Sequence, residues 1–121
     1  MTTQMARILH EQRKDVCHIE YVSPCPEDWM PAPNRCHQNA AAWVERFPSW
    51  QLVPGWLLVT EHEVMGTMFD AHSVVRGPDG RLWDVTQNDV HRFLVHPGDH
   101  DEFVKQVEAG PWVRLSYIPG L

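Results

Sequence analysis

The sequence contains no cluster of lysine and arginine, and its formal net charge is -6. Proteins that bind nucleic acid draw most of their affinity from cationic side chains that contact phosphates. No apolar run approaches the about 20 residues that a membrane-spanning helix requires, and residues 1 to 15 lack the apolar core of a signal peptide. We therefore expect no nucleic-acid partner, no membrane partner and a cytoplasmic location.

Internal repeats and low-complexity tracts are also missing. A length of 121 residues with 43% hydrophobic content predicts a single domain over residues 1–121 with one modest core. The three cysteines, Cys17, Cys25 and Cys36, cannot all pair within the chain, so at least one thiol is expected to be free. The oligomeric state stays open.

Prolines gather at residues 23 to 34, where they predict an ordered, non-helical loop. After this loop comes the apolar stripe of an amphipathic helix, formed by Cys36, Ala40, Trp43, Val44 and Phe47. Pro48 is expected to end the helix, and Asn34 is the expected capping residue at its start. The helix therefore carries a cysteine in its first turn.

The rest of the chain alternates between strand-like and helical patterns. Helices are predicted over about residues 3 to 13 and from about residue 100 to Ala109, closed by Gly110, and strands over residues 16 to 22, 50 to 61, 68 to 87 as a hairpin, and 112 to 118. The second of these strands is expected to be interrupted at Pro54 and Gly55. This order predicts an α+β fold, in which a small antiparallel sheet packs against the cysteine-bearing helix.

The turn "GPDG", residues 77 to 80, suits a type I turn followed by a glycine in the left-handed conformation. Such a turn makes Arg76 face Leu82, and the same register makes His72 and Asp84 diagonal neighbours on one face. Diagonal neighbours lie about 7–8 Å apart by backbone, which a histidine and an aspartate can bridge with a hydrogen bond. The turn therefore predicts a His72–Asp84 pair.

A cysteine in the first turn of a helix feels the partial positive charge of the helix N-terminus, which favours the thiolate. A thiolate nucleophile also needs a proton carrier, and an imidazole oriented by a carboxylate commonly fills that role. Cys36, His72 and Asp84 supply the three functions. We therefore predict a catalytic triad with Cys36 as nucleophile, His72 as general base and acid, and Asp84 as orienting carboxylate.

This arrangement, with the cysteine on a helix and the histidine and aspartate on a hairpin, resembles the transglutaminase-like branch of the papain-like thiol enzymes. The resemblance covers roughly residues 34 to 87 and rests on "NRC", "PGW", "AHSVV" and "DVT", with Asn34 where the family often has glycine. It implies a papain-like core and a cofactor-free acyl transfer from an amide-containing substrate to water or to an amine. Peptidases, amidases, glutamine deamidases and transglutaminases perform such reactions. It also implies an oxyanion hole made by the backbone N–H of Cys36 and a second donor, for which Asn34 and Trp29 are the candidates.

Other interpretations of the same residues stay open. Cys36 lies on an apolar stripe and can be a buried packing residue, in which case the tryptophans would form the recognition surface of a non-catalytic binding module. Trp56 and Trp83 can each wall a substrate cleft or pack in the core. His37 and Asn39 adjoin Cys36 in sequence, but neighbouring helical residues point in different directions, so neither is assigned to the site.

Zinc is the remaining alternative. Ligand atoms are available on His91, His96 and His100, which lie close together in sequence, and on Cys36, His37, His62 and His72. No paired spacing such as C-x-x-C or H-E-x-x-H accompanies them. No metal site is therefore predicted.

Overall fold

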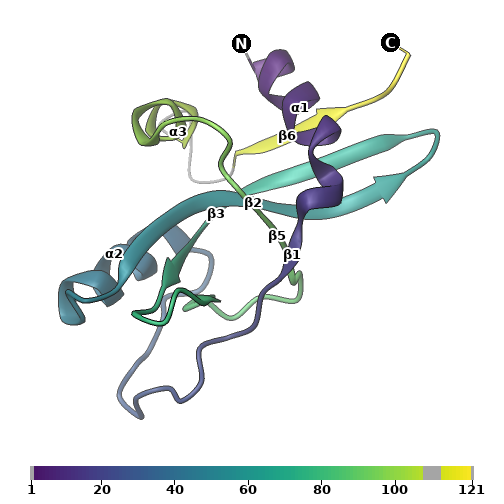
Figure 1. Cartoon of the computed structure of the whole chain (residues 1–121). Coiled ribbons are helices and arrows are strands. Elements are labelled where there is room, and N and C mark those ends of the chain that lie inside the picture. Colours follow the sequence, from purple (N-terminus) through teal and green to yellow (C-terminus); the bar gives the residue numbers. More distant parts are fainter. Residues whose placement is uncertain (1, 108–112, 121) are drawn as a thin grey trace.

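The structure, a computed structural model, describes residues 2–107 and 113–120. The helices are α1 (Thr2–Glu11), α2 (Cys36–Arg46) and α3 (His100–Val107), with a single 3-10 turn, η1 (Arg13–Asp15). The strands are β1 (Cys17–His18), β2 (Gln51–His62), β3 (Gly66–Arg76), β4 (Leu82–Trp83), β5 (Arg92–Val95) and β6 (Arg114–Tyr117) (Figure 1). The α+β class predicted from the sequence is confirmed. None of the described helices is long and apolar enough to cross a membrane.

All of these strands belong to one antiparallel sheet in the order β1-β5-β2-β3-β4, with β6 also paired to β3. β2 pairs along the whole of β3, so β4 and β6 must share the other edge of β3. On that edge β6 pairs with residues 67 to 70 and β4 pairs with residues 75 and 76. No described strand pairs with the stretch between them, which leaves a gap in the edge of the sheet at His72 and its neighbours.

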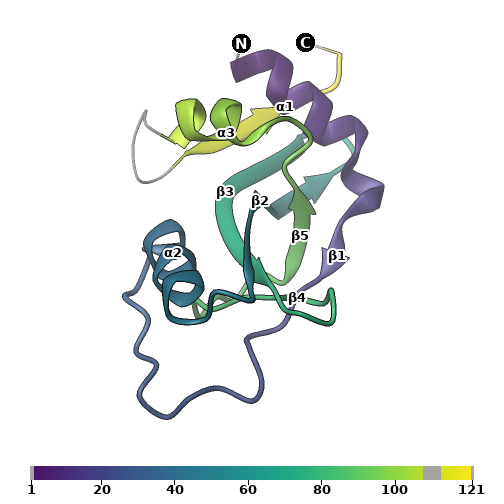
Figure 2. The same cartoon turned by 60° about the vertical axis from the view of Figure 1, so that its left-hand side comes forward.

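The helices lie on two sides of the long β2–β3 hairpin. In both views α1, α3 and β6 lie above the hairpin, and α2 lies lower, beside β3 (Figures 1 and 2). Figure 2 also shows α2 on the opposite side of β3 from β5 and β1. The N-terminus of α2 reaches the gap in the edge of β3, where the Cys36 sulfur lies 4.0 Å from the backbone oxygen of Ala71.

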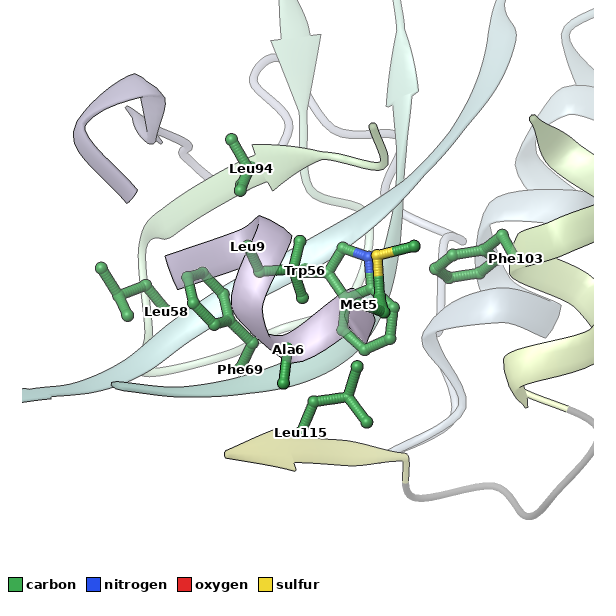
Figure 3. Close-up of a cluster of buried hydrophobic side chains, with 9 residues drawn as sticks. All are labelled: Met5, Ala6, Leu9, Trp56, Leu58, Phe69, Leu94, Phe103 and Leu115. Atoms are coloured by element: carbon green, nitrogen blue, oxygen red, sulfur yellow. The ribbon is translucent and has the colours of Figure 1, made fainter. Parts of the chain in front are cut away.

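One cluster of buried apolar side chains joins α1 and α3 to the sheet (Figure 3). Its members come from both helices and from four strands: Met5, Ala6, Leu9, Trp56, Leu58, Phe69, Leu94, Phe103 and Leu115. Burial of a large apolar side chain contributes about 1.5–3 kcal/mol each. This cluster therefore fixes α1 and α3 against the hairpin.

A second cluster fixes α2. Ala40 and Trp43 of the predicted apolar stripe are buried against Val75 of β3 and against Val22 and Val85 of two loops. The helix ends at Arg46, two residues before Pro48, as predicted. Because the stripe packs on the β4 end of β3, the first turn of α2 is directed along β3 toward the gap.

Several boundaries differ from the sequence-based expectation. β2 is continuous through Pro54. The oxygen of Pro54 accepts from the N–H of His96 at 3.0 Å, so Pro54 directs its backbone polar groups toward the end of β5. The N–H that proline lacks would point to that same side, so its absence removes no hydrogen bond to β3. The strand expected at residues 16 to 22 is only two residues long. The loop of residues 23 to 34 is non-helical, as expected. The predicted helix end at Ala109 and Gly110 lies outside the described residues.

The predicted hairpin register is confirmed. Arg76 is the pairing partner of Leu82, and the N–H of Gly77 donates to the oxygen of Arg81 at 2.9 Å. Gly80 has a φ of 88°, in the left-handed region, and its N–H donates to the oxygen of Gly77 at 2.9 Å. The turn chemistry therefore fixes which residues of the two arms share a face.

Replacing Gly55 with alanine is expected to destabilise the fold by about 1–3 kcal/mol, since an added Cβ would overpack the site. That atom would lie 2.2 Å from the ring of Phe93 and 2.5 Å from the oxygen of Leu94, and a backbone oxygen cannot move aside easily. Urea denaturation measures the change. Gly80→Asn is the control, because asparagine tolerates a positive φ and nothing lies within 4 Å of the position. A similar loss in both variants would contradict the packing argument.

Candidate functional site

His72 and Asp84 form a buried pair at the gap in the sheet edge. His72 Nε2 lies 2.8 Å from Asp84 Oδ2, and the two residues are 2% and 4% exposed. The other carboxylate oxygen, Oδ1, accepts from the N–H of Thr86 at 3.0 Å. The carboxylate is thus held at both oxygens, and it fixes the orientation of the imidazole. The pair expected from the turn is present.

Asp84 lies beyond the end of β4, and the loop at residues 20 to 22 holds it in place. The N–H of Asp84 donates to the oxygen of Glu20, and the oxygen of Asp84 accepts from the N–H of Val22, both at 2.8 Å. These contacts accompany a parallel bridge between Tyr21 and Asp84. The carboxylate is therefore positioned by a segment more than 60 residues earlier in the chain, as well as by the hairpin turn.

Asn39 and Trp29 also hold the segment that follows Asp84, and the hydrogen-bond donors of both residues already have acceptors within the protein. The Asn39 amide donates to Thr86 Oγ1 and to the oxygen of Ala32, both at 2.9 Å. The indole N–H of Trp29 donates to the oxygen of Val85 at 3.0 Å, and its backbone N–H donates to Pro26 at 3.0 Å. Because both donors of Trp29 are already used, its prediction as an oxyanion donor is wrong.

Asn34 does not cap α2. The capping position belongs to Arg35, which makes no side-chain capping hydrogen bond, and Cys36 is the first helical residue. Asn34 instead has a φ of 62°, in the left-handed region that glycine adopts freely and asparagine tolerates better than most residues. This conformation turns the chain into the helix, and it gives a physical reason for an asparagine where glycine would also fit.

Asn34→Gly is expected to leave the stability nearly unchanged, whereas Asn34→Ala should lose about 1–2 kcal/mol. The reason is the left-handed backbone at this position, which glycine adopts freely and which the short polar side chain of asparagine stabilises by local hydrogen bonds, whereas alanine offers neither advantage. The urea midpoints of the two variants give the comparison. Equal midpoints would show that the backbone strain at residue 34 is negligible.

The Cys36 thiol lies between two imidazoles. Burial raises the pKa of this thiol, but hydrogen bonds to His37 and His72 and the positive charge of His72 outweigh burial and lower the pKa from 9.0 to about 6. Burial lowers the pKa of His72, but hydrogen bonds to Asp84 and Cys36 and their negative charges raise it from 6.5 to about 9. Between these values the site holds a thiolate beside an imidazolium.

The ring nitrogens of His72 have separate partners. Asp84 occupies Nε2, so Nδ1 is the nitrogen left for the thiol. The three residues therefore follow one another in the order carboxylate, imidazole and sulfur. The sequence places these residues 36 and 12 positions apart, and the gap in the edge of β3 brings them together.

His37 belongs to the site, although the sequence did not assign it there. Its ring lowers the pKa of the adjacent Cys36 thiol, and its Nδ1 lies 2.7 Å from Ser73 Oγ. The ring also packs edge-on against Phe103 of α3, with 5.6 Å between the ring centres. The only sequence signal for His37 is that it adjoins Cys36. That signal does not say where the ring points, because the ring is oriented by Ser73, which lies 36 residues away in the sequence.

A cavity of about 330 Å³ opens over the thiol. Cys36, His72 and Asn34 line it together with apolar side chains from Leu57, Ala71 and Val113 and polar ones from Asp70, Thr86, Gln87, Asn88 and Arg114. Arg114 is bound to Asp70 by two hydrogen bonds, at 2.6 and 2.9 Å, so this wall carries paired charges. A cavity of this volume admits a short side chain or a small acyl group next to the sulfur.

The tryptophans proposed as cleft walls do not line this cavity. Trp56 is 0% exposed in the core, where its indole N–H donates to His96 Nδ1 at 3.0 Å. Trp83 is half-buried, and the Arg81 guanidinium lies 4.1 Å from its ring centre. Of the five tryptophans in the described residues, Trp43 and Trp56 are buried, and Trp29, Trp50 and Trp83 are half-buried. Trp112 lies outside the described residues.

The histidines considered as zinc ligands are dispersed. His62 Nδ1 accepts backbone N–H groups of its own turn, His91 Nδ1 donates to the oxygen of Ile19, and His96 bonds to Trp56. Within residues 2–107 and 113–120, no three His, Cys, Asp or Glu side chains are placed to bind one metal ion. The described residues therefore offer no metal centre.

Comparisons of the chain with protein-family models, with curated proteins and with solved structures each gave no match. The resemblance to transglutaminase-like enzymes consequently stays a prediction. What the site can do follows from the chemistry of its own residues.

Proposed function

We propose that the protein is a thiol-dependent acyl-transfer enzyme that acts on an amide, with Cys36 as nucleophile, His72 as acid and base, and Asp84 as orienting carboxylate. The observation that carries this proposal is the buried His72–Asp84 hydrogen bond of 2.8 Å in a cavity that Cys36 and His72 line together. A buried pair in which a thiol pKa falls while an imidazole pKa rises is the arrangement that a thiol nucleophile requires. A papain-like core of the transglutaminase-like type is part of the same proposal.

In the first half-reaction the Cys36 thiolate attacks the amide carbonyl, and a carbon–sulfur bond forms. The His72 imidazolium then donates its Nδ1 proton to the amide nitrogen, and the carbon–nitrogen bond breaks. An amine leaves, and a thioester on Cys36 remains beside neutral His72. Asp84 keeps the second ring proton on Nε2 throughout, so the nitrogen that exchanges protons always faces the sulfur.

In the second half-reaction a water molecule or an amine attacks the thioester, and neutral His72 takes its proton at Nδ1. The carbon–sulfur bond breaks, the thiolate leaves, and the imidazolium is restored. Water as acceptor gives a carboxylic acid, and an amine gives a new amide. The paired charges of Asp70 and Arg114 leave this wall without net charge, which favours a neutral acyl group.

The negative oxygen of the intermediate requires donors beside the sulfur. The backbone N–H of Cys36 precedes the first helical hydrogen bond of α2, which runs from the N–H of Asn39 to the oxygen of Arg35. That N–H has no partner inside the helix and points out of its N-terminus. The side-chain amide of Asn34, which lines the cavity, is the second donor in this proposal.

The proposal is tested with p-nitrophenyl acetate, an activated acyl donor that requires no recognition of a specific substrate. We expect an acetyl group on the peptide that contains Cys36, detected by mass spectrometry, together with a burst of p-nitrophenol. Cys36→Ala should abolish both signals, while the exposed Cys17 provides the matched control through Cys17→Ala, which should leave them unchanged. Acetylation that is equal at all three cysteines would overturn the assignment of Cys36 as nucleophile.

A further inference from the structure

The imidazole of His37, the second one beside the thiol, is held in place by Ser73. Ser73, the partner of His37, is 2% exposed, and it follows His72 in β3, so its side chain lies on the opposite face of the strand. The N-terminus of α2 thus contacts both faces of β3 at the gap, through Cys36 toward His72 and through His37 to Ser73. A buried hydroxyl 2.7 Å from Nδ1 restricts the orientation of the ring.

The partners of the two ring nitrogens define a protonation state. If the hydroxyl of Ser73 donates to Nδ1, that nitrogen carries a lone pair, and the ring proton stands on Nε2. Nε2 is then the donor that is left for the sulfur. We propose that His37 is a positioning residue of this site, which donates a hydrogen bond from Nε2 to the Cys36 thiolate and is held in that tautomer by Ser73.

The consequence is a division of work between the two imidazoles. His72, with its carboxylate partner, exchanges protons with the substrate and loses its charge during each cycle. His37, with a hydroxyl partner, keeps its proton and stabilises the sulfur whenever it is a thiolate. A hydrogen bond to a charged sulfur is stronger than one to a thioester, so His37 favours release of the thiolate from the thioester. The role of His72 and the release step rest on the proposed function, whereas stabilisation of the thiolate by His37 needs no substrate.

The titratable groups that face the thiol come from few elements. His37 belongs to α2 and His72 to β3, and Asp84 acts through His72. Asp70 and Arg114 on the cavity wall bind one another. α3 contributes the uncharged ring of Phe103 to His37. A change in the ionisation of Cys36 on substitution of His37 can therefore be assigned to the loss of its hydrogen bond.

The test measures the rate of iodoacetamide alkylation against pH, by mass spectrometry of the peptide that contains Cys36. His37→Phe keeps a ring against Phe103 but removes the donor, whereas His37→Gln keeps an N–H near the place of Nε2. We expect His37→Phe to raise the midpoint by about one pH unit, which is about ten-fold less thiolate below the midpoint. His37→Gln should raise it less, and Ser73→Ala should give an intermediate rise. At pH values where every variant is fully ionised, the rates should lie within about three-fold of one another, because a thiolate of higher pKa is slightly more nucleophilic.

Each outcome decides the inference. An unchanged midpoint in both His37→Phe and Ser73→Ala would overturn it and leave His37 as a packing residue. Equal rises in His37→Phe and His37→Gln would also overturn it, because the donor would then be irrelevant. Far-UV circular dichroism checks that each variant is folded. A wild-type midpoint near 9 that does not respond to His72→Ala would instead overturn the proposed function, so the two failures can be told apart.

Discussion

Replacing His72 with alanine is expected to slow the alkylation of Cys36 at pH 7 by about 2–10-fold. In the wild type the pKa of Cys36 is lowered to about 6, so nearly all of the thiol is ionised at pH 7. His72 supplies a hydrogen bond and a positive charge, and loss of such a charged partner should raise the midpoint by about 1–2 pH units. Iodoacetamide labelling against pH, read at the Cys36 peptide, measures the shift directly.

In His72→Ala, part of the lowering of the Cys36 pKa should remain. Without His72, the thiol keeps His37 and the N-terminus of α2, so the midpoint should stay below the ordinary value of 9.0. His72→Gln is a useful second variant, because its amide can still bond to the buried carboxylate of Asp84. His91→Ala, at an exposed histidine outside the cavity, is the control and should label as the wild type does. If the pH midpoint of Cys36 alkylation is the same in the wild type and in His72→Ala, Cys36 is a packing residue and not an activated nucleophile.

The features that the sequence predicted are those set by local chemistry. The "GPDG" turn determines the register of its own arms, so the His72–Asp84 pair could be expected without knowledge of the rest of the fold. The apolar stripe of α2 likewise determines which face of that helix is buried. In both cases the residues that decide the structure lie within one element or one turn.

The features that were missed depend on how distant segments dock. The contact of His37 with Ser73 and that of Asn39 with Thr86 join residues 36 and 47 positions apart, and no periodicity encodes them. They exist because the edge of β3 is open between β4 and β6 and the first turn of α2 fills the opening. Trp29 was misassigned for the same reason, since its acceptor on Val85 is known only once the loop is placed.

Asn34 illustrates a third kind of limit. An asparagine before a helix favours the capping position in general, yet here the chain needs a left-handed residue one position earlier. Both roles are common for asparagine, and the sequence alone does not separate them. The choice matters for the site because it leaves the Asn34 side chain at the cavity rather than on the helix N–H groups.

Replacing Asp84 with asparagine is expected to lower the pKa of His72 from about 9 toward its ordinary range and to slow deacylation of acetylated Cys36 by about 10²–10⁴-fold. Asp84 raises the pKa of His72 through a hydrogen bond and a negative charge, so loss of the charge must lower it. NMR titration of the His72 ring measures the first effect. Mass spectrometry of the acetyl group after reaction with p-nitrophenyl acetate measures the second.

The slower deacylation follows from the hydrogen bond at the other carboxylate oxygen. The N–H of Thr86 needs an acceptor, so the oxygen of the asparagine will face Thr86 and its NH₂ will face His72 Nε2. That NH₂ donates, which forces the proton of the neutral ring onto Nδ1, the nitrogen that must accept a proton from water. The base is then blocked although the ring keeps its place. Asp89→Asn, at an exposed carboxyl in the loop that follows, is the matched control, and an equal slowing there would contradict this account.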